Sequence, residues 1–108
     1  MNKMDQFLQA SLQQNASDLH FLSGDPPRIR VHGGLKNLME QKLTVEFVQD
    51  AIFEIMDGAA QATFEREDAA DFAYEIPDVS RFRGNAIRHL KGGGGNFRAI
   101  PSTAMSLE

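Results

Sequence analysis

Apolar side chains near the N-terminus recur with the spacing of one helix face, at Met4, Phe7, Leu8 and Leu12. This spacing predicts a helix over residues 3–14 whose apolar stripe faces the core. Asn15 is suited to end the helix, because asparagine tolerates the left-handed backbone conformation that is common at helix C-termini.

Short segments with strand character follow. Residues 18–22 predict a first strand, and polar and apolar side chains alternate over residues 28–32, as in a half-buried strand. Gly33 and Gly34 can both supply a positive φ, so we expect a tight turn there and an antiparallel return over residues 35–38.

A second helix is predicted after Thr44, whose hydroxyl can cap the first turn. Its apolar stripe consists of Val45, Val48, Ile52, Ile55 and Met56. Gly58 stands where a glycine ends a helix, and residues 59–66 predict a further short helix.

The C-terminal half predicts three more strands. Apolar and polar residues alternate over 72–76 until Pro77 ends the segment, and residues 81–90 and 96–100 form a long hairpin. The four glycines from Gly92 to Gly95 are interpreted as a flexible connection between the two hairpin strands. The order of helices and strands predicts an α+β domain with helices packed on an antiparallel sheet.

Length and composition narrow the function classes. The 108 residues, 42% of them apolar, suit a single domain with one core. The net charge of −4 argues against non-specific nucleic-acid binding, and the absence of cysteine excludes disulfides and thiolate chemistry. Apolar runs fall far short of the ~20 residues that span a bilayer, so we expect a soluble chain.

Histidines do not suggest a metal site. His20, His32 and His89 are expected on three different strands without metal-ligand spacing, so no bound metal is predicted. Asp18 follows Ser17 directly after the first helix, and we expect it to bond to the backbone of a turn.

Basic residues are concentrated near the C-terminus. The segment 80–101 carries four arginines and a lysine although the chain as a whole is acidic. Such a local concentration indicates an anion site, with phosphate as the most suitable ligand.

Five separated motifs now carry a resemblance. They are ASDLH at 16–20, GDPPRIRVHG at 24–33, DFAYE at 71–75, RFRGN at 81–85 and FRAIP at 97–101. In this order they resemble the N-terminal domain of type IV pilus retraction ATPases, the PilT/PilU family, over nearly the whole chain.

The resemblance implies a PAS-like fold and places residues 1–108 as the first domain of a longer motor ATPase. A RecA-like ATPase domain that binds ATP and Mg²⁺ would follow, and six copies would form a cytoplasmic ring. The implied partners are that ATPase domain, the neighbouring subunits and a pilus platform protein of the inner membrane.

The chain itself has no G-x-x-x-x-G-K-[ST] motif, and its glycine run is followed by Asn96 rather than by lysine. We therefore expect this fragment to hold no cofactor and to hydrolyse no ATP alone.

The resemblance also implies that arginines of this domain contact the phosphates of ATP. Arg83 and Arg98 match the family positions, with Arg81 as a third candidate, and guanidinium offers a permanently charged fork of donors to phosphate. Arg28 and Arg30 are candidates for a subunit interface, with plain solvent exposure as the equal alternative.

The expected distance between Arg83 and Arg98 is a difficulty if both are to contact the same phosphate. A symmetric turn at the glycines would place Arg98 opposite His89, about 20 Å from Arg83. A bulge at Gly84, where the family has an apolar residue, could shorten that distance. Alternatively, the two arginines contact different partners. Arg81 and Arg83 could also lie on a solvated face and pair with carboxylates such as Glu65, Asp68 or Asp71.

Other function classes remain as alternatives. A PAS-like sensor or protein-interaction module would bind a small ligand in an enclosed pocket, whereas the predicted strands turn phenylalanine and isoleucine inward. A stand-alone phosphotransfer or hydrolytic enzyme would need a nucleophile–base constellation, which the sequence does not present.

Overall fold

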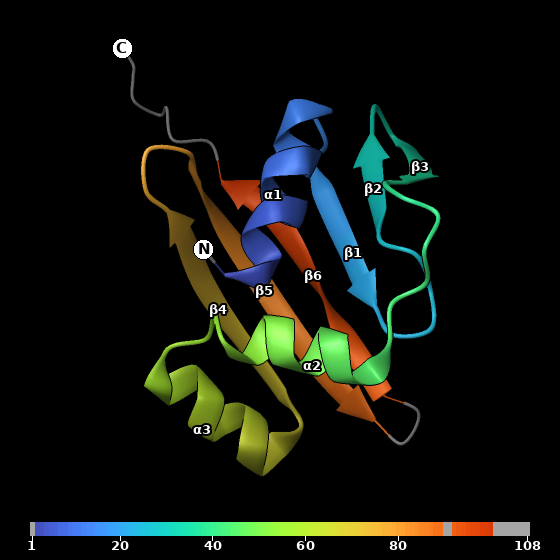
Figure 1. The fold of residues 1–108 in the computed structure, drawn as a ribbon. Helices are drawn as coiled ribbons and strands as arrows, with labels where there is room; N and C mark the ends of the chain where they lie inside the picture. Colours follow the sequence, from blue (N-terminus) through green and yellow to red (C-terminus); the bar gives the residue numbers. More distant parts are fainter. Residues whose placement is uncertain (1, 90–91, 101–108) are drawn as a thin grey trace.

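The computed structural model describes residues 2–89 and 92–100. Its elements, in chain order, are α1 (Lys3–Gln13), β1 (Asp18–Leu22), β2 (Arg28–Val31), β3 (Gly34–Asn37), α2 (Val45–Phe53), α3 (Gly58–Glu67), β4 (Ala69–Ile76), β5 (Ser80–His89) and β6 (Gly92–Ile100). The strands form one sheet in the order β3-β2-β1-β6-β5-β4 (Figure 1). Each neighbouring pair is antiparallel, which confirms the predicted α+β class.

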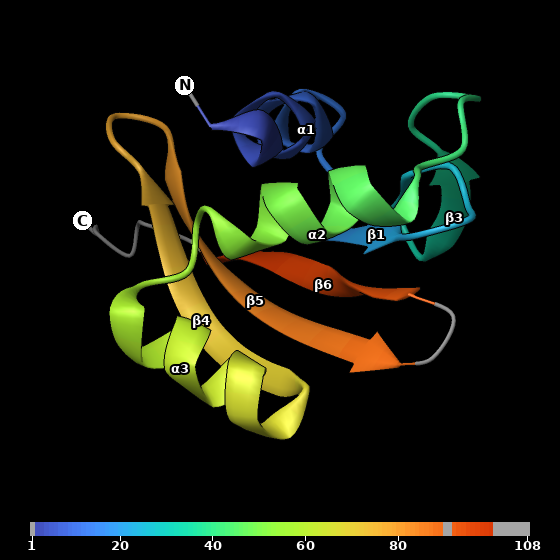
Figure 2. The same cartoon turned by 60° about the horizontal axis from the view of Figure 1, so that its bottom comes forward.

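The helices gather on one face of the sheet. Figure 2 shows α1 and α2 on the same side of the strands, with α3 beside β4. Among residues 2–89 and 92–100, no element covers the opposite face of β1, β5 and β6. This open face carries the residues considered below.

The core lies between the helices and the covered face. Leu19 and Phe21 on β1 are buried beneath α1 and α2, and Phe21 meets the Phe7 ring edge to face at 5.0 Å. Phe72 on β4 and Phe97 on β6 form a second such pair at 6.0 Å. Each aromatic ring buries a large apolar area, so these pairs dominate the packing.

Two of the predicted helix signals are confirmed and one is wrong. Asn15 has a φ of 60°, and the Thr44 hydroxyl accepts a hydrogen bond from the Phe47 N–H at 3.1 Å. Gly58, however, begins α3 instead of ending α2. The reason is Asp57, whose carboxylate accepts a bond from the Ala60 N–H at 2.8 Å and caps the new helix.

The turn between β2 and β3 lies one residue earlier than predicted. Val31 pairs with Gly34, so the turn consists of His32 and Gly33, with φ angles of 52° and 82°. Histidine tolerates the left-handed region better than most residues, and Gly34 therefore becomes the first residue of β3. His32 lies in this turn and not on a strand.

The prediction for the glycine run is also wrong. Gly92 to Gly95 begin β6 and pair with β5, and Gly94 and Gly95 also pair with β1 on the other side. A side chain would not fit there: a Cβ would lie 2.1 Å from the Ile87 carbonyl oxygen at Gly93 and 2.2 Å from that of Phe21 at Gly94. The hairpin connection falls at positions 90 and 91, which lie outside the described residues, as do residues 101–108.

Candidate functional site

The register of β5 and β6 brings the two principal arginine candidates together. Arg83 and Arg98 are direct partners in the antiparallel pairing. The predicted separation of about 20 Å is therefore wrong, because it assumed a turn at the glycines. Pairing runs without interruption from Arg81 to His89, so no bulge is present at Gly84.

This row of opposed residues continues across the sheet. Arg98 also pairs with Asp18 on β1, and Asp18 pairs with Arg30 on β2. By strand alternation all four side chains belong to the open face. The Arg98 side chain is 71% exposed and that of Arg30 is 42% exposed, whereas Asp18 is only 14% exposed. The carboxylate thus lies beneath the guanidinium groups.

Asp18 is the best-connected polar group of this face. Its Oδ1 accepts a hydrogen bond from Arg98 Nε at 3.0 Å, and its Oδ2 accepts one from Ser17 Oγ at 2.8 Å. Arg30 Nε lies 4.0 Å from Oδ2. Partial burial would raise the pKa of Asp18, but the bonds from Ser17 and Arg98 and the charge of Arg98 outweigh it and lower the pKa below its usual value.

The expected role of Asp18 in backbone bonding is therefore corrected. Sequence reasoning missed it because the contact depends on three strands meeting at one register position. Its place beside Ser17 in the ASDLH motif was the available signal.

A second polar row lies next to the first. His20, Asn96, Asn85 and Asp71 are successive partners across β1, β6, β5 and β4. His20 Nδ1 and Asn96 Oδ1 are 2.6 Å apart, and His20 Nε2 is buried without a hydrogen-bond partner in the described structure. This row and, from the first row, Asp18, Arg83 and Arg98 line an open cleft of about 430 Å³.

Arg81 and Arg83 do not pair with the carboxylates considered as alternatives. Within residues 2–89 and 92–100, no ion pair joins either arginine to Glu65, Asp68 or Asp71. Asp68 instead binds Arg88 at 2.7 Å. Arg81 lies one row beyond Arg83, opposite Ile100 and Glu75, and is exposed.

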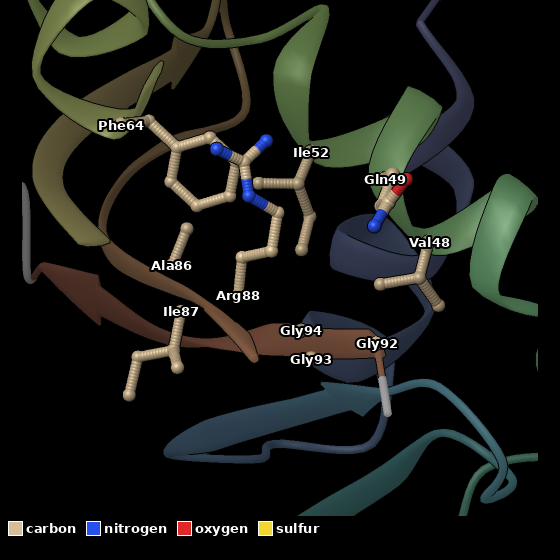
Figure 3. Close-up of a pocket in the computed structure, with 10 residues that line it drawn as sticks. All are labelled: Val48, Gln49, Ile52, Phe64, Ala86, Ile87, Arg88, Gly92, Gly93 and Gly94. Carbon is tan, nitrogen blue, oxygen red and sulfur yellow. The ribbon is translucent and has the colours of Figure 1, made fainter. Parts of the chain in front are cut away.

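Arg88 belongs to the covered face of the sheet. Its guanidinium carbon lies 4.8 Å from the centre of the Phe64 ring, which allows a cation–π contact. Figure 3 shows Arg88 against Phe64 and Ile52, with Ile87 pointing the other way. The hollow at this place measures only about 10 Å³, about one water-sized probe.

The interface candidates Arg28 and Arg30 share the open face, as predicted from their alternation. Arg28 Nε donates to Asn37 Oδ1 at 3.1 Å, and its Nη1 lies 3.8 Å from Asp25 Oδ2. Arg30 Nη1 donates to the Gly33 carbonyl oxygen at 3.2 Å. Arg30 thus lies beside the Asp18–Arg98 pair, while Arg28 contacts Asn37 on β3 and Asp25.

Metal-binding and membrane-spanning features were also considered in the described part of the chain. No group of three or more histidine or carboxylate side chains gathers there in a way that could hold a metal ion. None of the helices described is both long and apolar enough to span a bilayer.

Comparison with known proteins gives specific relatives, although no family model matches. The chain is 39% identical over 103 residues to the type IV pilus retraction ATPase PilT of Pseudomonas aeruginosa, covering 95% of this chain and 30% of PilT. It is 35% identical over 82 residues to a twitching motility protein of Neisseria gonorrhoeae, covering 76% and 22%. With PilU of P. aeruginosa the identity is 23% over 106 residues, covering 98% and 28%.

Solved structures agree. The fold matches the pilus retraction motor PilT with bound ADP at a TM-score of 0.82 and 23% identity, covering 95% of this chain and 30% of that one. It matches the ATPase DotB of Legionella pneumophila at a TM-score of 0.74 and 28% identity, covering 93% and 29%. The chain therefore spans less than a third of these relatives.

These matches define an α+β domain of the kind found in the pilus retraction motor PilT and in the ATPase DotB. More specifically, the chain is similar in sequence and fold to the N-terminal domain of type IV pilus retraction ATPases of the PilT/PilU family. The resemblance carried by the five motifs is thereby confirmed.

Proposed function

We propose that this domain is the first part of a type IV pilus retraction motor, that it closes over ATP held by a following RecA-like ATPase domain, and that Arg83 and Arg98 contact the phosphates. One observation carries the proposal: two arginines that are distant in sequence lie opposite each other on an uncovered sheet face. In this proposal the whole protein hydrolyses ATP and the domain alone does not.

The spacing of the pair suits one phosphoryl group. Residues opposite each other on antiparallel strands have Cα atoms about 4.5–5.5 Å apart, so two long side chains can converge on one anion. Guanidinium groups stabilise the charge that develops on a transferred phosphoryl group, and a rigid strand holds them in place. Both arginines stand on inner strands of the six-stranded sheet.

Motion would follow from differential binding. The domain would be closed when its arginines contact a triphosphate and open after the phosphates leave, which turns the nucleotide state into rotation of one domain against another. The cradle for the triphosphate and its Mg²⁺ belongs, in this proposal, to the ATPase domain. Arg81, one row away, would serve as an auxiliary phosphate contact.

The remaining partners follow from the same proposal. Arg28 and Arg30 would contact a neighbouring subunit in a homo-hexameric ring. That ring would stand on the cytoplasmic side of the inner membrane against the pilus platform protein, with no role for nucleic acid.

The packing of the interior does not favour the sensor alternative. In the described part of the chain, one hollow between the helices and β5 and β6 and another at the C-terminal end of α1 measure about 10 Å³ each. Phe97 and Leu19 are buried side chains of this core. A hollow of this size holds at most about one water molecule.

The experiment uses the full-length protein that carries this domain. Arg83→Ala and Arg98→Ala should each lower ATP turnover by roughly a thousandfold or more, as expected for a lost arginine finger, while ATP binding persists. Arg66→Ala is the control, because Arg66 is exposed on α3 and contacts only Glu67 among the described ion pairs. Normal turnover in both test variants refutes the assignment.

A further inference from the structure

Asp18 is a carboxylate of the open face that stands on β1 between two neighbouring strands, β2 and β6. It is the register partner of Arg98 on one side and of Arg30 on the other. At 14% exposure it is far less accessible than either arginine. The Asp18 carboxylate therefore lies deeper in the open face than the guanidinium groups of Arg30 and Arg98.

Its two oxygens have different partners. Ser17 Oγ donates to Oδ2 at 2.8 Å, and the Ser17 N–H donates to the Arg30 carbonyl oxygen at 2.9 Å, which fixes Ser17 to β2. The carboxylate is thereby oriented before any arginine contacts it. Oδ1 remains for Arg98.

Arg98 uses only one of its nitrogens in this contact. The bond at 3.0 Å comes from Nε, and the side chain stays 71% exposed. Among the described residues neither terminal nitrogen has a hydrogen-bond partner, so both are available to an anion while Nε is held. Arginine can bind one partner through Nε and another through its terminal nitrogens, because its donors form a rigid planar fork.

We propose that Asp18 is a positioning residue for Arg98: it holds Nε so that the terminal nitrogens are pre-oriented toward the phosphate group. This inference rests on the proposed function. Asp18 also offsets the mutual repulsion of Arg30, Arg83 and Arg98, which stand in one row across β2, β5 and β6 with Asp18 on β1 between Arg30 and Arg98. An ordinary surface ion pair would hold no group for catalysis and would contribute little to stability.

The test is made in the full-length protein with Asp18→Asn, which keeps the size of the side chain and removes its charge. Misplacing a catalytic group by about 1 Å can cost up to a hundredfold, so we expect kcat to fall between about tenfold and a hundredfold with KM nearly unchanged. In the Arg98→Ala background the same change should have no further effect on kcat, because its target is gone.

Asp68→Asn provides a matched control. Asp68 holds Arg88 through Nε at 2.9 Å and Nη2 at 2.7 Å on the covered side, remote from the cleft. Asparagine also tolerates the left-handed conformation of this residue, whose φ is 61°. This variant loses a comparable ion pair and should keep its kcat.

The outcomes separate the two proposals. If Arg83→Ala and Arg98→Ala both leave turnover normal, the proposed function fails. If only Arg98→Ala leaves it normal, the role of Arg98 is overturned, and that of Asp18 with it. If Arg98→Ala is inactive and Asp18→Asn is normal, only the role of Asp18 is overturned. An additional loss of kcat in the double variant also overturns it, since that result indicates general structural damage.

A spectroscopic measurement on the 108-residue chain adds a readout independent of turnover. The Arg98 Nε–H resonance should shift and exchange faster with water in Asp18→Asn, but not in Asp68→Asn. Should Asp18→Asn fail to fold, Ser17→Ala loosens the same carboxylate and should produce the same shift to a smaller extent. An unchanged Arg98 resonance in a folded variant contradicts the proposal.

Discussion

Gly84 offers a sharp test of how the site is supported. It lies on β5 between Phe72 on β4 and Phe97 on β6, and all three are register partners on the covered face. A Cβ at this position would lie 2.8 Å from Phe97 Cε2 and 2.9 Å from Phe72 Cζ. The two rings thus occupy the volume that a side chain at this position would need.

The expected cost of Gly84→Val follows from two opposing terms. Overpacking a closed core costs about 1–3 kcal/mol, while replacing glycine inside a strand returns about 0.5–1 kcal/mol of backbone entropy. We expect a net loss of about 1–2 kcal/mol. Phe97→Leu alone should also destabilise, because it leaves a void beneath the sheet. Together the changes should be less harmful than their sum by about 1 kcal/mol, since the valine fills that void.

Urea unfolding of the four proteins measures this coupling, with an unchanged m-value as the sign of an unaltered unfolding reaction. Gly34→Val is the control, because Gly34 has a negative φ and its Cβ would meet only the Val31 carbonyl oxygen at 3.7 Å. It should be neutral or slightly stabilising. If Gly84→Val is as stable as the native chain and shows no coupling to Phe97→Leu, the packing argument is refuted.

Two further predictions concern stability. Gly93→Ala should destabilise the fold by about 3 kcal/mol or more or prevent folding, because Gly93 has a φ of 137° and a Cβ there would clash with a carbonyl oxygen. Circular dichroism measures this loss. Gly58→Ala is the control and should be neutral, because a Cβ at Gly58 would lie in open space. Tyr74→Phe removes the hydroxyl that donates to Asp5, a carboxylate only 8% exposed, and should cost about 1–3 kcal/mol in urea unfolding at pH 7. Burial, and then the bond to Asp5, raise the pKa of Tyr74 above 10.0, so the unfolded chain loses this proton first and the advantage of tyrosine should shrink above about pH 10. An advantage that persists unchanged to pH 11 contradicts this account.

The elements with an amphipathic pattern were predictable from sequence. The stripe of α1, the Thr44 cap of α2 and the alternation in β4 each record a side-chain preference that acts locally. Gly58 was misassigned because Asp57 offers a cap of its own, and the two signals compete at adjacent positions. Local rules do not decide such a competition without the packing of α3 on β4.

The glycine run was not predictable in the same way, because glycine has no side-chain pattern to read. Its place in β6 depends on how closely the neighbouring strands approach: Phe21 and Ile87 bring carbonyl oxygens within 2.2 Å of where a Cβ would stand. This contact exists only once three strands have assembled. Sequence reasoning therefore treated as a connection what is the most tightly enclosed stretch of the sheet.

Placing the glycine run in a turn also gave a wrong partner for Arg98, because the register of the arginine pair depends on where the glycines lie. Because the glycines belong to β6 and Gly92 pairs with His89, the partner of Arg98 is Arg83 and not His89. Side chains alternate along a strand, so a slip of a single residue would instead turn Arg98 toward the helices and away from Asp18. The glycines pin the register, because only residues without side chains fit at those rungs of the ladder. The chemistry of the open face is thus fixed by a segment that carries no chemical group of its own.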